Sequence, residues 1–177
     1  MAIHDYVRKN SFKILICGNG AVGKTTIGKK ISGNFNANEN IEMTTGIEFH
    51  NLTIPSKEPI DCQLWDLGGQ DQFREFQDNF FDSATIVVLI FAVNMYNSYM
   101  KLSSWKSLIS KEILEKTYLI ANKIDASNRS VPKQKGLEFA LKNNMAYFEI
   151  SALTGEGIEK FKSDLINTIK TIYLAKD

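Results

Sequence analysis

The chain has 177 residues, of which 44% are hydrophobic, and this length and composition suit one domain with a packed core. Lys and Arg total 21 against 20 Asp and Glu, so the formal net charge is +1. A charge this close to zero gives no electrostatic reason to expect nucleic acid or an anionic membrane as a partner. Both cysteines lie in apolar, strand-like runs without Cys or His neighbours at metal-ligand spacing. We therefore expect Cys17 and Cys62 to be buried thiols of a reduced, cytoplasmic chain.

No segment has the length and hydropathy of a membrane span. The longest apolar run extends from Ala84 to Val93, and its length suits a buried strand instead. Residues 1–10 lack the apolar core of a signal peptide, and Ala2 stands where N-myristoylation requires glycine. Because no cysteine near Asp177 could accept a prenyl group, the sequence predicts no intrinsic membrane anchor.

Strand-like and helix-like patterns alternate along the chain, which is typical of an α/β protein. The link from Pro55 to Pro59 is too short for a helical crossover, so the strands that it joins should form an antiparallel hairpin. We expect a single domain over residues 1–177, with residues 1–11 as a short N-terminal extension. Its three layers would be a six-stranded, mostly parallel sheet with one antiparallel strand, and helices on both faces. The expected strands cover residues 12–17, 46–54, 60–65, 85–93, 117–121 and 146–150.

Helical patterns fill the intervals between these strands. A helix is expected over Lys24–Ile31, and Pro132 should begin another that carries Leu137, Ala140 and Leu141. Apolar residues recur at helical spacing in two further stretches and indicate faces that pack on the core. These residues are Tyr99, Leu102, Trp105, Ile109 and Ile113 in the first stretch, and Ile158, Phe161, Leu165, Ile169 and Ile172 in the second.

A phosphate-binding loop lies between the first strand and the first helix, where Gly18-Asn19-Gly20-Ala21-Val22-Gly23-Lys24-Thr25 matches the pattern G-x-x-x-x-G-K-[ST] in full. The glycines let the backbone curl so that successive N–H groups point at the β-phosphate, and the helix adds its positive N-terminal end. Lys24 would bridge the β- and γ-oxygens, and the Thr25 hydroxyl would bind Mg²⁺. The residues expected to bind nucleotide here are Gly18, Gly20, Ala21, Val22, Gly23, Lys24, Thr25 and Thr26.

Two other segments are expected to face this loop. Asp66-Leu67-Gly68-Gly69-Gln70 follows the third expected strand, where the carboxylate of Asp66 could hold magnesium, usually through one of the ion's waters. The N–H of Gly69 could donate to the γ-phosphate, and Gln70 would orient the attacking water. Of the two threonines that precede the second strand, spacing favours Thr44 over Thr45 for completing the magnesium shell when a γ-phosphate is present.

The most informative stretch is Asn122-Lys123-Ile124-Asp125, because it indicates which base is bound. A carboxylate at Asp125 can accept two hydrogen bonds at once, from the N1–H and the N2 amine of guanine. Adenine lacks both donors and would leave a buried carboxylate unpaired, which is costly. Asn122 is expected to take part in base recognition, and the stem of Lys123 would lie against the ring. Backbone N–H groups of Ser151-Ala152-Leu153 could bind the guanine O6.

The order of these motifs resembles that of the Ras-superfamily small GTPases, over roughly Phe12 to Tyr173. Two features point to different subfamilies. Thr44-Thr45-Gly46-Ile47-Glu48-Phe49 and Trp65 look like the Rab pattern, whereas Asp66-Leu67-Gly68-Gly69-Gln70-Asp71 looks more like the Arf pattern. The resemblance implies the P-loop GTPase fold and a molecular switch that binds GTP or GDP with Mg²⁺ and slowly hydrolyses GTP to GDP and phosphate.

The resemblance also implies a conformational cycle. With GTP bound, Thr44 and Gly69 would both contact the γ-phosphate, and after hydrolysis their loops would relax. These switch segments would cover roughly residues 35–46 and 68–81. Phe35 is the candidate to pack edge-on against the guanine, although the first switch is one residue longer than the usual spacing.

Protein partners follow from the same resemblance. In Rab proteins an aromatic triad between the switches forms much of the effector surface, and Phe49, Trp65 and Phe80 fall at the matching positions. Ordinary core packing is the alternative reading of the same three side chains. Activating and exchange proteins are expected as further partners of a monomeric chain.

Two details bear on the rate of hydrolysis. Gly20 leaves room for the attacking water, where a side chain would crowd it, so the chain should be competent to hydrolyse GTP. No arginine occurs between Lys24 and Thr44, so a built-in arginine finger of the Gα kind is missing. Because such a finger contributes ~10³–10⁵ in rate, we expect slow intrinsic turnover and acceleration by a separate activating protein.

Two other functions fit part of the sequence. One is a guanine-nucleotide-dependent assembly platform that barely hydrolyses GTP, which would follow if Thr44 were mispositioned. The other is an ATPase or nucleotide kinase, which fits the phosphate loop but not Asp125 or the absence of an arginine-rich lid. The histidines, His4 and His50, are expected at the solvated surface without a catalytic role.

Overall fold

The protein is built on a mixed six-stranded sheet with the strand order β2-β3-β1-β4-β5-β6. The structure, a computed structural model, describes residues 11–69 and 78–175. The hairpin predicted from the short link is confirmed, since β2 runs antiparallel to β3 while every other neighbouring pair is parallel. Each predicted strand end lies within two residues of the observed one. The strands are β1 (Ser11–Cys17), β2 (Ile47–Ile54), β3 (Ile60–Leu67), β4 (Ile86–Ala92), β5 (Thr117–Asn122) and β6 (Ala146–Ile150).

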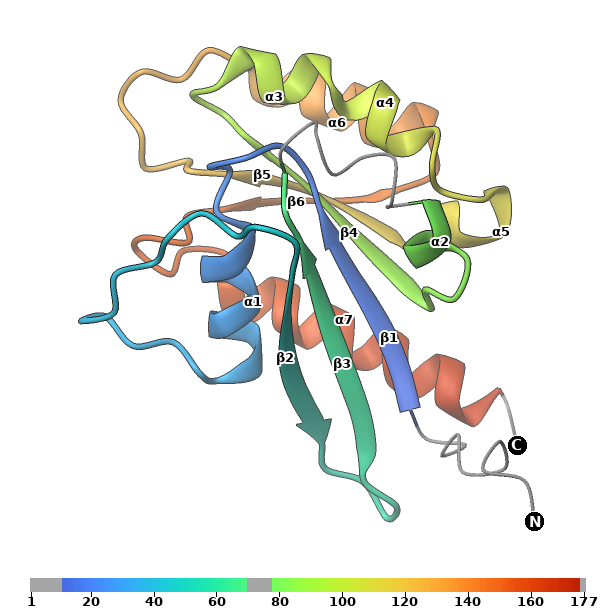
Figure 1. Ribbon diagram of the computed structural model, residues 1–177. Coiled ribbons are helices and arrows are strands. Elements are labelled where there is room, and N and C mark those ends of the chain that lie inside the picture. The colour runs from blue at the N-terminus through green and yellow to red at the C-terminus, as the bar shows by residue number, and fades with distance from the viewer. Residues whose placement is uncertain (1–10, 70–77, 176–177) are drawn as a thin grey trace.

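Helices cover both faces of the sheet and complete the three predicted layers (Figure 1). One face is covered by α1 (Lys24–Ser32) and α7 (Ile158–Leu174). The opposite face is covered by α2 (Asp78–Phe81), α3 (Tyr96–Met100), α4 (Leu102–Lys106), α5 (Lys111–Leu114) and α6 (Lys133–Lys142). Within the described residues, no helix combines the length and hydropathy that crossing a membrane requires.

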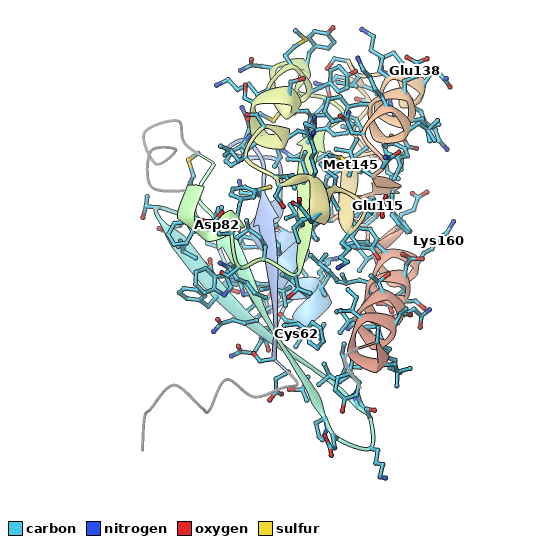
Figure 2. All side chains as sticks on the ribbon, turned by 90° about the vertical axis from the view of Figure 1, so that its right-hand side faces the viewer. Cys62, Asp82, Glu115, Glu138, Met145 and Lys160 are labelled. Atoms are coloured by element: carbon cyan, nitrogen blue, oxygen red, sulfur yellow. The ribbon has the colours of Figure 1, made fainter. Side chains whose placement is uncertain are left out.

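Successive side chains of each strand point to opposite faces of the sheet, so the hydrophobic core has two parts, one on each face. Ile14 and Ile16 of β1 pack with α1 and α7, whereas Leu15 and Cys17 face the other helices, as side chains of opposite strand faces must. Every residue of β4 is buried, which explains its continuous apolar run. Charged side chains such as Glu138 of α6 and Lys160 of α7 lie at the periphery of the outer layers (Figure 2). Both cysteines are free and buried, as predicted.

Two expectations from the sequence require correction. The apolar pattern from Tyr99 to Ile113 is divided among three short helices, α3, α4 and α5, rather than one. A serine side chain lies at the end of α4, where the Ser107 hydroxyl donates to the carbonyl of Ser104 at 2.8 Å. Such local bonds compete with helix propagation. His50 is not at the surface: it is only 5% exposed, because β2 turns it towards α1.

The topology also decides where the motifs meet. β1, β3, β4, β5 and β6 are parallel to one another, so their carboxyl ends lie at the same edge of the sheet. The phosphate loop follows β1, Gly68-Gly69 follows β3, and the Asn122 motif begins at the end of β5. Ligands of open α/β sheets bind outside this edge, so the topology brings these three motifs to the same end of the sheet.

Candidate nucleotide-binding site

A cleft of about 370 Å³ opens at this edge of the sheet. Its size lies within the range of small-molecule sites. Two of its residues, Ala21 and Lys123, have left-handed backbone angles, with φ of 60° and 65°. Such angles cost a residue other than glycine about 1 kcal/mol or more and concentrate at ligand sites. The lining consists of Gly20, Ala21, Gly23, Lys24, Thr25, Thr26, Ile41, Glu42, Met43, Thr44, Gly69 and Lys123.

The phosphate loop holds its lysine inside the curl of the backbone. α1 begins at Lys24, directly after Gly23, whose φ of 97° is one that glycine adopts freely. The Lys24 amine donates to the backbone carbonyl of Asn19 at 2.8 Å, and the residue is 6% exposed. Burial lowers the pKa of Lys24, while the nearby Asp66 carboxylate acts in the opposite direction. The buried Lys24 amine has lost most of its contact with water, and a bound anion would replace the interactions that water no longer provides.

Three oxygen-bearing side chains converge beside this lysine. The Thr25 hydroxyl donates to Oδ2 of Asp66 at 2.5 Å and lies 2.9 Å from the Thr44 hydroxyl, which is itself 3.4 Å from the same carboxylate oxygen. The carboxylate is fully buried, and its Oδ1 has no hydrogen bond from the described residues. Burial raises the pKa of Asp66, and the hydrogen bond from Thr25 opposes that shift. Hard oxygen ligands and a buried carboxylate fit Mg²⁺, and the favoured threonine, Thr44, is the one found here.

Glycines after β3 bring the first switch and the phosphate loop into contact. The Gly68 N–H donates to the Gly46 carbonyl at 2.7 Å, and the Gly20 N–H donates to the Gly69 carbonyl at 3.1 Å. A Cβ on Gly69 would lie 2.3 Å from the Asn19 carbonyl carbon, so only glycine fits this close approach. Gly69 therefore contacts the loop on which the γ-phosphate is expected.

The Asn122 side chain links two backbone segments of the site by hydrogen bonds. It is 1% exposed, its Nδ2 donates to the Val22 carbonyl at 2.7 Å, and its Oδ1 accepts from the Ala152 N–H at 2.9 Å. The phosphate loop, β5 and the segment after β6 are thus joined by one buried amide. Both of these side-chain bonds of Asn122 go to the protein backbone, and its predicted part in base recognition stays a prediction.

Asp125 is held by the segment that follows β6. The Ser151 hydroxyl donates to Oδ1 of Asp125 at 2.5 Å and accepts from the Thr154 N–H at 3.0 Å. The Ser151 hydroxyl therefore orients this carboxylate, whereas the sequence predicted only a backbone role for Ser151, at the guanine O6. Leu153 is 80% exposed, so its side chain takes no part in packing the core.

Phe35 is one of the predicted site residues that do not line the cleft, and it is 38% exposed. Gln70 lies outside the described residues. The Lys30 amine lies 4.5 Å from the centroid of the Phe35 ring. The same amine lies 4.0 Å from the place of a Cβ on Gly155, on the segment after β6. Phe35 is thus on the side of the site where guanine is expected, and its contact with the base stays a prediction.

Two neighbours of the phosphate loop were missed from the sequence. The indole N–H of Trp105 donates to Oδ1 of Asn19 at 3.0 Å, although Trp105 was predicted only as a core residue. Its apolar spacing gave no sign of this polar contact. Met43 reaches over the loop, with its Sδ 3.9 Å from the position of a Cβ on Gly20.

The three aromatic residues expected at an effector surface form one cluster. Phe49 and Trp65 meet edge to face with centroids 4.9 Å apart, and Phe80 lies 5.8 Å from Trp65. The Lys13 amine is 4.0 Å from the Trp65 ring centroid. Phe49 is 50% exposed, so the cluster presents aromatic surface to solvent as well as packing internally.

Known proteins resemble this chain over most of its length. The profile of the Ras family matches residues 13–171. The Ras-related protein Rab-30 of Homo sapiens is 32% identical over 170 residues, which cover 93% of this chain and 82% of Rab-30. The Ras-related protein Rab-18-B of Danio rerio is 30% identical over 164 residues, covering 90% and 79%. The Ras-related protein Rab-18 of Lymnaea stagnalis is 31% identical over 165 residues, covering 90% and 80%.

Proposed function

Because this chain belongs to the Ras family of small GTPases, it binds GTP and GDP and hydrolyses GTP as a molecular switch, and we propose which of its residues perform each part of that work. The observation that supports the assignment most directly is the convergence of Thr25, Thr44 and Asp66 oxygens beside the buried amine of Lys24. Members of the family also act through effectors, activating proteins and exchange proteins.

The phosphates would be bound by the phosphate loop and Lys24. Thr25, Thr44 and Asp66 would hold Mg²⁺, which when bound helps to neutralise the charge on the β- and γ-phosphates. Lys24, already desolvated, would replace its bond to the Asn19 carbonyl with phosphate oxygens. A fixed charge in a water-poor site stabilises the charge that develops during transfer without reorganising. Gln70 would orient the water that attacks the γ-phosphorus.

Guanine would be selected by Asp125, whose carboxylate can accept from the N1–H and the N2 amine together. Ser151 holds one carboxylate oxygen at 2.5 Å and so limits its rotation. The stem of Lys123 would cover one face of the ring, and the backbone from Ser151 to Leu153 would supply a donor to O6. Phe35 would approach the base edge from the loop after α1.

The switch would act through the contacts between Gly68, Gly69 and the first switch. With GTP, Thr44 and the Gly69 N–H would both bind the γ-phosphate, and the 2.7 Å bond from Gly68 to Gly46 would keep the two loops in register. After hydrolysis the shared ligand is gone and the loops can separate. Effectors would bind the exposed side of the Phe49, Trp65 and Phe80 cluster. An activating protein would supply the missing arginine.

Single-turnover phosphate release from bound GTP, with Mg²⁺ in excess, tests these roles. Thr44→Ala should slow release and weaken the dependence on Mg²⁺ by about 10-fold, and Gln70→Leu should abolish release above the buffer rate. Thr45→Ala is the matched control, because this neighbouring threonine is exposed and should leave both readouts unchanged. Equal effects of Thr44→Ala and Thr45→Ala would overturn the assignment of Thr44.

A further inference from the structure

The β2–β3 hairpin places three metal-ligating side chains on one face. Glu48 of β2 is paired directly opposite Asp66 of β3 in the antiparallel register, and His50 lies two residues further along β2. Residues two apart on a strand share a face. The ligating atoms of Glu48, His50 and Asp66 all lie within 4.8 Å of one another.

Two polar atoms of these residues are buried without a hydrogen bond from the described part of the chain. They are Nε2 of His50, which is 5% exposed, and Oδ1 of Asp66, which is fully buried. Nε2 of His50 lies 4.0 Å from Oε1 of Glu48. An unsatisfied buried polar group costs about 1–3 kcal/mol, and such groups are rare in native proteins. Here two of them belong to residues that lie close together on the paired strands β2 and β3.

The positive charges near this point are divided between the two carboxylates, and the Lys24 amine is the one near Asp66. Carboxylates directly opposite each other on paired strands repel. The Lys29 amine lies 3.7 Å from Glu48 but only 2.6 Å from Glu39, so it is engaged mainly by Glu39. A cation between Glu48, His50 and Asp66 would satisfy both orphaned atoms and offset the repulsion.

We propose that Glu48, His50 and Asp66 bind a divalent transition-metal ion of the zinc class, at a site separate from the Mg²⁺ site. One imidazole nitrogen and two carboxylate oxygens suit zinc, whereas Mg²⁺ prefers oxygen ligands alone. Three protein ligands leave the fourth tetrahedral position to water. Small side-chain movements suffice, because ligand atoms about 2 Å from such an ion lie about 3.3 Å apart.

Glu48 is the ligand of this site that solvent reaches, and Asp66 is the ligand that it shares with the Mg²⁺ site. Glu48 has a side chain that is 39% exposed and lines a hollow of about 400 Å³ together with Thr25 and Lys29. Oδ2 of Asp66 faces Thr25 and Thr44, while Oδ1 is the atom left for the second ion. Two ions on one carboxylate must change each other's affinity reciprocally, so zinc would modulate the binding of Mg²⁺ and nucleotide.

Calorimetric titration with Zn²⁺ of the full chain, loaded with GDP and kept in excess Mg²⁺, tests the site. The native chain should bind one equivalent of Zn²⁺, and Co²⁺ should give the intense visible absorption of a tetrahedral site. Glu48→Gln and His50→Gln should each weaken binding by about 100-fold or more, since even outer residues of metal sites contribute 10–100-fold. Asp61→Asn, which removes a carboxylate further along the same hairpin, should bind as the native chain does.

Equal Zn²⁺ binding by the native chain, Glu48→Gln and His50→Gln, or no binding by the native chain, would overturn the proposal. Should His50→Gln fail to fold, the half-exposed Glu48 still gives the answer. The amount of bound GDP, measured in the same samples, shows whether a variant has lost zinc binding alone or nucleotide binding as well. Variants that lose Zn²⁺ while retaining GDP support the second site, whatever the rate of hydrolysis.

Discussion

Replacing Asn122 by alanine tests whether one buried amide joins the phosphate loop to the segment after β6. In the structure its Nδ2 and Oδ1 bond to the Val22 carbonyl and the Ala152 N–H, at 2.7 and 2.9 Å. Alanine would leave both backbone groups buried and unpaired. Each such group costs about 1–3 kcal/mol, so we expect Asn122→Ala to lower the free energy of unfolding by about 2–6 kcal/mol.

Thermal unfolding followed by circular dichroism gives the first readout. In a chain of this size, about 1 kcal/mol corresponds to about 2–4 °C, so the midpoint should fall by roughly 5–20 °C. The GDP and Mg²⁺ concentrations must be held fixed, because bound ligand raises the apparent stability. Release of a fluorescent GDP analogue gives the second readout and should accelerate about 10-fold or more, since Val22 belongs to the phosphate loop.

Asn97→Ala is the matched control, because Asn97 is an exposed asparagine on α3. It should change the midpoint by no more than about 2 °C, as exposed substitutions do. If Asn122→Ala lowered the midpoint no further than Asn97→Ala, the buried bonds would contribute nothing and the bracing role would be refuted. If stability fell while GDP release stayed the same, Asn122 would support the fold alone.

Three further outcomes are expected. Gly20→Val should change the free energy of unfolding by no more than about 0.5 kcal/mol, because a Cβ there meets nothing closer than Met43 at 3.9 Å. Single-turnover hydrolysis should nevertheless slow, since the valine side chain would crowd the attacking water. Unchanged hydrolysis would contradict this reasoning. Asp125→Asn should weaken GDP by about 10³-fold or more and favour xanthosine diphosphate, whose 2-oxo group accepts from the new amide, in a competition assay. Burial raises the pKa of Cys17 and Cys62 to about 12, so only about one thiol in 10⁴ is ionised at pH 8. A disulfide reagent should therefore react with them only after unfolding. Rapid reaction of the native chain would show that the thiols are accessible.

The sequence by itself determined the fold class and the local motifs. Alternating patterns and the short link at residues 55–59 were enough to predict the sheet, including its antiparallel hairpin, because strand length and crossover length are local properties. The phosphate loop and the Asn122 motif could be interpreted for a similar reason. In each, a few neighbouring residues carry the binding chemistry, and their spacing along the chain fixes their spacing in the fold.

The tertiary structure decided which distant groups meet. The bond between Trp105 and Asn19 spans two layers, and the sequence shows Trp105 only as an apolar position of a helical pattern. The burial of His50 depends on the register of β2 against β3 and on the closeness of Gly28, where a Cβ would lie 2.9 Å from the imidazole ring. Periodicity predicts which face of a strand a residue occupies. Only the packing of α1 on that face determines that His50 is buried, and only the pairing of β2 with β3 places Asp66 beside it.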